Sequence, residues 1–164
     1  MITEIYLGYP PQHVINWIKN HSQPATHEET WYKYVGDTEW RTVMLGGTIA
    51  LVDEMGEPTG QIDNPKDIIA IEIGTGTTAN PVTSIGNYAF YTCSSLTDVT
   101  IPNGVTSIGE GAFYNCNNLS EMSMLGFTCN KVKNSALNWG IAVSTKQLVT
   151  IQCSDGYVVL NDKS

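Results

Sequence analysis

Basic residues are scarce in this sequence. Lys and Arg together account for 8 of the 164 residues, against 16 Asp and Glu, so the formal net charge is −8. Proteins hold the phosphates of nucleic acids mainly through Lys and Arg, and those phosphates repel an acidic surface. We therefore expect no nucleic-acid partner.

Long apolar runs are also lacking. No stretch approaches the roughly 20 apolar residues that a membrane-spanning helix needs, so we expect no membrane span. The beginning of the chain, Met1 to Glu4, has neither the basic region nor the apolar core of a secretory signal, and no signal peptide is visible. Removal of a signal and the lack of one both fit the sequence.

The patterns that carry enzymatic or metal chemistry are missing too. The histidines, His13, His21 and His27, do not show the H-E-x-x-H spacing of a zinc protease, and no C-x-x-C motif provides a zinc site. The glycine-rich stretch 74–78 lacks the Gly-Lys-Ser/Thr ending of a phosphate-binding loop. We expect no enzymatic activity, no bound metal ion and no cofactor.

What the sequence does contain is an internal repeat. Residues 82–101 recur at 105–124, and this offset of 23 residues holds the apolar positions while the polar positions vary. Examples are the pairs Phe90/Phe113, Cys93/Cys116 and Leu96/Leu119. A fixed period of this size is typical of a solenoid, in which each coil buries its apolar side by stacking on the next coil.

The repeated motif V-T-S-I-G-x-x-A-F-x-x-C-x-x-L-x-x-V-x-I-P resembles the BspA-type leucine-rich repeat, which occurs in bacterial surface proteins and in some phage and prophage tail proteins. The resemblance covers roughly residues 68–127. It implies a curved solenoid with a sheet on one face, used for adhesion or recognition rather than catalysis. It also implies a place at the cell surface, outside the cell or on a virion.

The fold class that we expect is α+β, in three parts. Residues 1–65 form a small N-terminal α+β unit, and residues 66–127 form a short leucine-rich-repeat solenoid of two full 23-residue coils with a leading partial coil. Residues 128–164 form a cap that ends in a β-hairpin, because Asp155-Gly156 separates two apolar alternating runs. The elements expected in the N-terminal unit are a strand at 3–8, a helix at 11–20, a hairpin over 29–45 and a strand at 49–52.

The four cysteines could form two disulfides. However, Cys93 and Cys116 occupy the same position of the repeat, which indicates a ladder of small buried thiols. We expect all four cysteines, including Cys129 and Cys153, to be free thiols.

The alternation within each coil predicts which residues face solvent. Val99 and Ile101 point inward, so their neighbours point outward, and the repeat places the equivalent residues of the next coil beside them. The residues that we expect on this outward face are Glu72, Asp98, Thr100, Glu121 and Ser123. Their acidic and hydroxyl groups suit a polar or basic partner, although a merely solvated strand face explains them as well.

The aromatic residues of the expected hairpin form a second candidate site, centred on Trp31 and Trp40. Exposed aromatic rings can stack on a sugar or a peptide, whereas packing in a small core is the alternative. Alternation places Trp31 and Lys33 on one face of the strand, and Tyr32 and Tyr34 on the other.

These observations predict a non-enzymatic recognition or adhesion module that binds a protein or a glycan on a surface. The alternative is a structural assembly protein of a phage or prophage tail, which would make a homo-oligomer possible.

Overall fold

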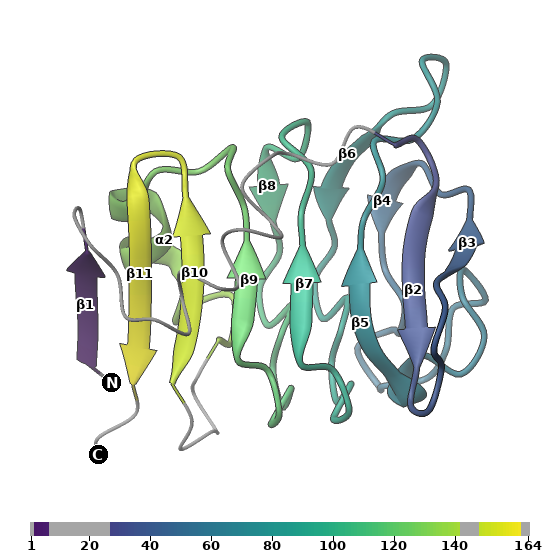
Figure 1. Ribbon diagram of the computed structural model, residues 1–164, viewed down its shortest axis with the longest axis horizontal. Helices are drawn as coiled ribbons and strands as arrows, with labels where there is room; N and C mark the ends of the chain where they lie inside the picture. Colours follow the sequence, from purple (N-terminus) through teal and green to yellow (C-terminus); the bar gives the residue numbers. More distant parts are fainter. Residues whose placement is uncertain (1, 7–26, 142–147, 162–164) are drawn as a thin grey trace.

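The computed structural model describes residues 2–6, 27–141 and 148–161. They form two facing β-sheets (Figure 1). The larger sheet has eight strands in the order β1-β11-β10-β9-β7-β5-β2-β3. These strands are β1 (Ile2–Tyr6), β2 (Thr30–Tyr34), β3 (Arg41–Val43), β5 (Ile68–Glu72), β7 (Asp98–Thr100), β9 (Glu121–Ser123), β10 (Val149–Cys153) and β11 (Gly156–Asn161).

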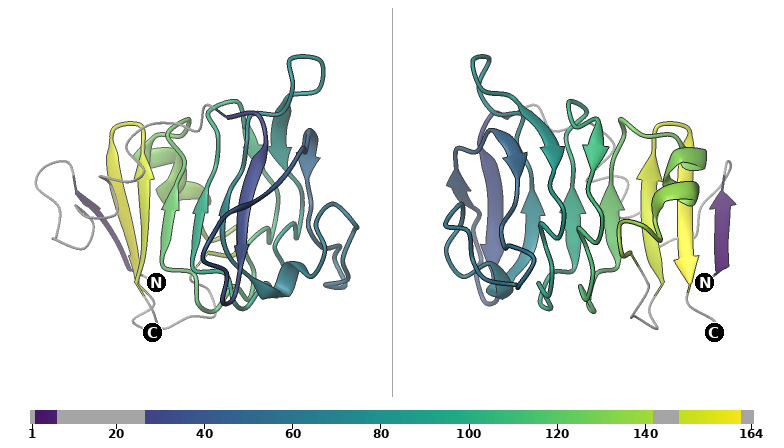
Figure 2. Two further views of the ribbon diagram at one scale, coloured as in Figure 1. Left: turned by 45° about the vertical axis from the view of Figure 1, so that its right-hand side comes forward. Right: turned by 180° about the vertical axis from the view of Figure 1, so that it is seen from behind.

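The smaller sheet has three parallel strands in the order β4-β6-β8. They are β4 (Gly47–Ile49), β6 (Val82–Ile85) and β8 (Ser107–Ile108). Two helical segments complete the described structure, the 3-10 helix η1 (Pro65–Asp67) and the α-helix α2 (Cys129–Ser135). The views in Figure 2 show the small sheet and α2 on the same side of the large sheet.

The centre of the large sheet is the predicted solenoid. Strands β5, β7, β9 and β10 are all parallel, and Val99 pairs with Met122, which lies 23 residues further along the chain. Each coil runs from the large sheet to the small sheet and returns through hydrogen-bonded turns, where the N–H of Cys93 donates to the carbonyl of Phe90 at 3.0 Å.

The core between the sheets repeats with the same period. Phe90 and Phe113 are both buried, and their rings stack at a centroid distance of 5.1 Å and an interplanar angle of 8°. Cys93 and Cys116 are buried in the same layer, and the Cys116 thiol donates to the carbonyl of Phe90 at 3.1 Å. The predicted ladder of buried thiols is confirmed, and the phenylalanines at the equivalent positions of the repeat stack beside it.

The described part of the expected N-terminal unit does not form a separate core. Strand β2 pairs with β5, β4 pairs with β6, and Leu45 and Ile49 belong to the same hydrophobic cluster as Phe90. The Thr48 and Ser84 hydroxyls, 2.8 Å apart, join β4 to β6 as well. Residues 27–65 therefore extend the solenoid, because strands this short bury their apolar faces against it.

Other expected elements differ in detail. The strand expected at 49–52 ends at Ile49, because the N–H groups of Leu51 and Val52 both turn to the carbonyl of Ala89. The strand expected at 3–8 is β1, which pairs antiparallel with β11. The helix expected at 11–20 lies outside the described residues.

The cap combines one confirmed element with one that was missed. The C-terminal hairpin is present as β10 and β11, with Cys153 opposite Gly156. The polar segment after Phe127 contains α2, a helix that the sequence did not predict. Its first turn is capped by the Thr128 side chain, which accepts from the N–H of Lys131 at 3.2 Å.

Candidate binding surfaces

The face of the large sheet that points away from the core is called the outer face below. Strand pairing aligns two rows of residues across it. The first row runs through Trp31, Glu72, Thr100 and Ser123, and the second through Lys33, Ala70, Asp98 and Glu121. The two site candidates that the sequence suggested separately therefore lie on one continuous face.

The measured exposure corrects the expectation that all five outward residues face solvent. Glu72, Asp98 and Glu121 are half-buried, but Thr100 is only 4% exposed and Ser123 only 1%. Both side chains are short, whereas the longer carboxylates of Asp98 and Glu121 on the same two strands keep part of their surface exposed. Thr100 and Ser123 are thus part of the packed structure and cannot contact a ligand in this conformation.

The aromatic end of the outer face is built on β2 and β3. Trp31 stacks on His27 at a centroid distance of 3.9 Å and lies 6.3 Å from Trp40. The ammonium group of Lys33 lies 4.8 Å from the centre of the Trp40 ring, at the distance of a cation–π contact. Trp40 is 37% exposed, so this cluster of His27, Trp31, Lys33 and Trp40 offers ring surface to solvent.

The other face of β2 packs inward, so the two aromatic sets lie on opposite faces as alternation predicts. Tyr32 and Tyr34 pack against the core cluster and meet edge to face at 5.5 Å. An ion pair fixes the adjoining turn, in which Nε of Arg41 donates to Oδ2 of Asp37 at 2.8 Å. The Arg41 hydrogen bond, followed by one from the backbone N–H of Tyr34, holds the pKa of Asp37 below its ordinary value.

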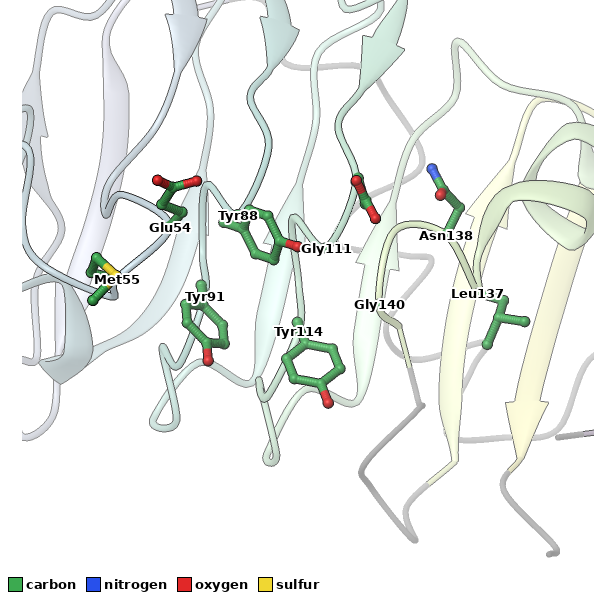
Figure 3. Close-up of a pocket in the computed structure, with 10 residues that line it drawn as sticks. Glu54, Met55, Tyr88, Tyr91, Gly111, Tyr114, Leu137, Asn138 and Gly140 are labelled. Atoms are coloured by element: carbon green, nitrogen blue, oxygen red, sulfur yellow. The ribbon is translucent and has the colours of Figure 1, made fainter.

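A second surface was not singled out from the sequence. Three tyrosines on the turns that follow β6 and β8 line an open groove with a cavity volume of about 590 Å³ (Figure 3). We call it the tyrosine groove. The described residues that line it are Glu54, Met55, Tyr88, Tyr91, Glu110, Gly111, Tyr114, Leu137, Asn138 and Gly140.

A signal for this groove was present in the sequence. Tyr91 and Tyr114 are 23 residues apart and directly follow the buried phenylalanines, so the repeat places one above the other outside the core. Their rings lie 5.8 Å apart, and Tyr88 meets Tyr91 at 5.6 Å. The residues from the other segments, Met55 and Leu137, could not be assigned because they are far away in the sequence.

The described residues offer little for catalysis. They contain no group of three or more His, Cys, Asp or Glu side chains that could hold a metal ion. The four cysteines are buried free thiols, and burial raises the pKa of Cys93 to about 12. A thiol with such a pKa is protonated at neutral pH and is a poor nucleophile.

Taken together, the stacked parallel coils and the exposed rings and carboxylates define a solenoid protein whose surfaces are suited to contacts with other molecules. Over residues 71–153 the chain matches the family described as "BspA type Leucine rich repeat region (6 copies)", and it belongs to this family. The match continues beyond the 68–127 region expected from the sequence, because β10 stacks parallel on β9 as part of a further coil. No curated protein and no solved structure matches the chain significantly.

Repeats of this family are generally non-enzymatic protein-binding or adhesion modules and are typical of surface-associated proteins. Within the part of the chain that the structure describes, no helix has the length and apolar character needed to cross a membrane.

Proposed function

We propose that this protein is a recognition module that binds a protein or a glycan on a surface through the outer face of its large sheet. The observation that carries the proposal is the continuity of that face. The row that begins at Trp31 has Glu72 as its next member, so a half-buried aromatic ring and a half-buried carboxylate lie side by side, with the more exposed Trp40 close to Trp31. Aromatic residues anchor many interfaces, and carboxylates add hydrogen bonds and charge selectivity.

The contact that this face makes is expected to be weak for a single copy. Only Trp40 presents a well-exposed ring, and the half-buried acids offer part of their surface. Weak sites become effective when several copies act together, since the second contact is then intramolecular. Attachment to a cell or a virion provides such multiple copies.

The proposal is tested with a glycan array and with binding of the purified protein to bacterial and host cells. Two outer-face variants are compared with the unmodified chain, Trp40→Ala and the charge-reversed pair Asp98→Lys and Glu121→Lys. We expect both to weaken binding by about fivefold or more, the scale of one to two contacts. A matched control reverses two exposed acids outside the face, Glu57→Lys and Asp67→Lys.

The melting temperature of each variant shows whether the fold is retained. Unchanged binding by the folded outer-face variants would contradict the proposal. A solution mass that shows an oligomer, with the same variants dissociating it, would instead favour assembly of a tail or similar structure, the alternative suggested by the resemblance.

A further inference from the structure

The tyrosine groove is separate from the outer face, since its rings come from the turns after β6 and β8. Figure 3 shows Tyr91 and Tyr114 side by side, with Tyr88 next to them. Tyr114 is 38% exposed, and the flanking Met55 and Leu137 are 78% and 61% exposed. Large apolar side chains at such exposure are unusual when they gather at one place, and they mark contact sites.

Tyr88 has an unfavourable backbone conformation. Its φ angle is +58°, in the left-handed region that residues other than glycine rarely adopt. The equivalent residue of the next coil, 23 positions on, is Gly111 with a φ of +65°, which is the residue type that this conformation favours. The motif leaves this position variable, and one coil has tyrosine here where the next has glycine. Such local strain is concentrated at functional sites.

The glycine of the next coil makes room for that tyrosine. A Cβ atom added at Gly111 would lie 2.6 Å from Cε1 of Tyr88, so the ring covers the glycine directly. Gly140 is similarly close to Tyr114, where a Cβ atom would lie 2.9 Å from the backbone nitrogen. The close approach of Gly111 to the Tyr88 ring, and of Gly140 to the Tyr114 backbone, leaves the three rings grouped on the surface.

The three rings form one compact aromatic surface. Tyr88 and Tyr91 are 5.6 Å apart and Tyr91 and Tyr114 are 5.8 Å apart, measured between ring centroids. A polyproline II segment is an extended helix with three residues per turn, so it can present a proline ring to such a surface at every turn. Aromatic-lined grooves are a common docking site for such segments, because the extended conformation is already formed before binding.

The negative charge of the groove favours a cationic ligand. Glu54 and Glu110 are both exposed, and no basic residue is found among the described residues that line the groove. The described part of the chain gives neither carboxylate an ion-pair partner. Tyrosine faces also attract Lys and Arg side chains, so rings and carboxylates favour the same kind of ligand.

We propose that the tyrosine groove binds an extended, proline-rich segment of a partner protein that carries Lys or Arg. The prolines lie across the three tyrosine rings, and the basic side chains reach Glu54 and Glu110. A neutral glycan would leave both carboxylates without the cation that their position favours, and an anionic glycan would be repelled.

The test uses a fluorescein-labelled peptide of three Pro-Pro-Lys repeats as the probe, with the full chain in fluorescence anisotropy. A peptide of three Pro-Pro-Glu repeats is the charge control, and chitohexaose is the competing neutral sugar. We expect the basic peptide to bind at least about tenfold more tightly than the acidic one, since two charge contacts and a cation–π contact change sign or vanish.

Variants then locate the site. The pair Glu54→Gln and Glu110→Gln is expected to weaken peptide binding about fivefold, and Tyr114→Ala about tenfold, consistent with one aromatic anchor. Asp67→Asn, a matched loss of one exposed charge outside both proposed surfaces, is expected to change it less than about twofold. The first two variants alter exposed side chains, and melting temperatures identify any loss of folding.

Several results would overturn the proposal. They are failure of the basic peptide to bind the unmodified chain, equal binding of both peptides, and undiminished binding by the Glu54→Gln and Glu110→Gln pair. Displacement of the tyrosine-ring NMR signals by chitohexaose but not by the peptide would assign the groove to a glycan. None of these results bears on the outer face, whose test uses different residues and a different readout.

Discussion

At the scale of single residues, stability is concentrated in the layer of stacked phenylalanines. Replacement of Phe113 by Ala removes a ring that is 1% exposed and stacked on Phe90, and should lower the free energy of unfolding by about 3–5 kcal/mol. Leu137→Ala, an exposed apolar control, should cost less than about 0.5 kcal/mol. Urea denaturation measures both values, and a cost below about 1 kcal/mol for Phe113→Ala would mean that the core is not built on this ladder.

The cysteines give a second prediction at this scale. Burial raises the pKa of Cys93 and Cys116, and the pKa of Cys153 is raised by burial and by the neighbouring Cys129. Native protein at pH 8 should therefore react slowly with a thiol reagent such as Ellman's reagent, whereas four thiols should react after denaturation without reduction. Fewer than four would indicate a disulfide and refute the thiol ladder.

Single residues also show what the sequence could and could not predict. The burial of Phe90 and Cys93 followed from the repeat alone, because the core positions recur after every coil. The burial of Thr100 and Ser123 did not, since alternation assigns a face of the sheet but not how much of that face is accessible. The tyrosine groove was not predicted, because the residues that line it come from segments that are far apart in the sequence.

At the scale of elements, the attachment of α2 depends on a charge. Oδ1 of Asp155, in the β10–β11 turn, accepts from the backbone N–H of Cys129 at 2.8 Å at the start of α2. That bond, followed by one with the Cys129 thiol, holds the pKa of Asp155 below its ordinary value. A negative charge at a helix N-terminus is also favoured by the helix dipole.

The sign of the pH dependence follows from this lowered pKa. The ionised form of Asp155 stabilises the fold at pH values above the ordinary pKa of an aspartate, and this contribution is lost as the pH falls through the lowered value. Asp155→Asn should therefore lower the melting temperature at pH 7, and the difference from the unmodified chain should vanish near pH 2. Asp67→Asn serves as the exposed control, and a difference for Asp155→Asn that is the same at both pH values would contradict the role of the charge.

Elements differ in how far the sequence determines them. The C-terminal hairpin was predicted because Asp155-Gly156 separates two alternating runs, a local signal. Helix α2 was missed because only Cys129 and Val132 are buried within its seven residues, too few to show a helical period. The membership of β2 in the large sheet was missed because its pairing with β5 joins residues far apart in the sequence.

At the scale of the whole molecule, the described residues form a single stack of coils rather than a repeat with separate attachments. The hydrophobic cluster runs without interruption from Leu45 to Leu160, through both sheets. The family match covers the centre of this stack, and β2, β3 and β11 extend its sheet on either side. The repeat was visible in the sequence, but its extent was not, because the outer coils no longer keep the 23-residue period.

Both proposed binding surfaces depend on this stacking. The outer face needs β2 beside β5 to bring Trp31 next to Glu72, and the tyrosine groove needs adjacent coils to bring Tyr91 next to Tyr114. We therefore infer that β2, the repeat strands and β10 unfold together as one cooperative unit.

Native-state hydrogen exchange, read amide by amide by NMR, tests this claim most directly. The account predicts that the slowest amides of β2, β7 and β10 exchange with opening free energies within about 1 kcal/mol of one another and of the global unfolding value. Opening of β2 at a free energy several kcal/mol lower than that of β7, with β7 and β10 unchanged, would show a separate N-terminal unit and contradict the account.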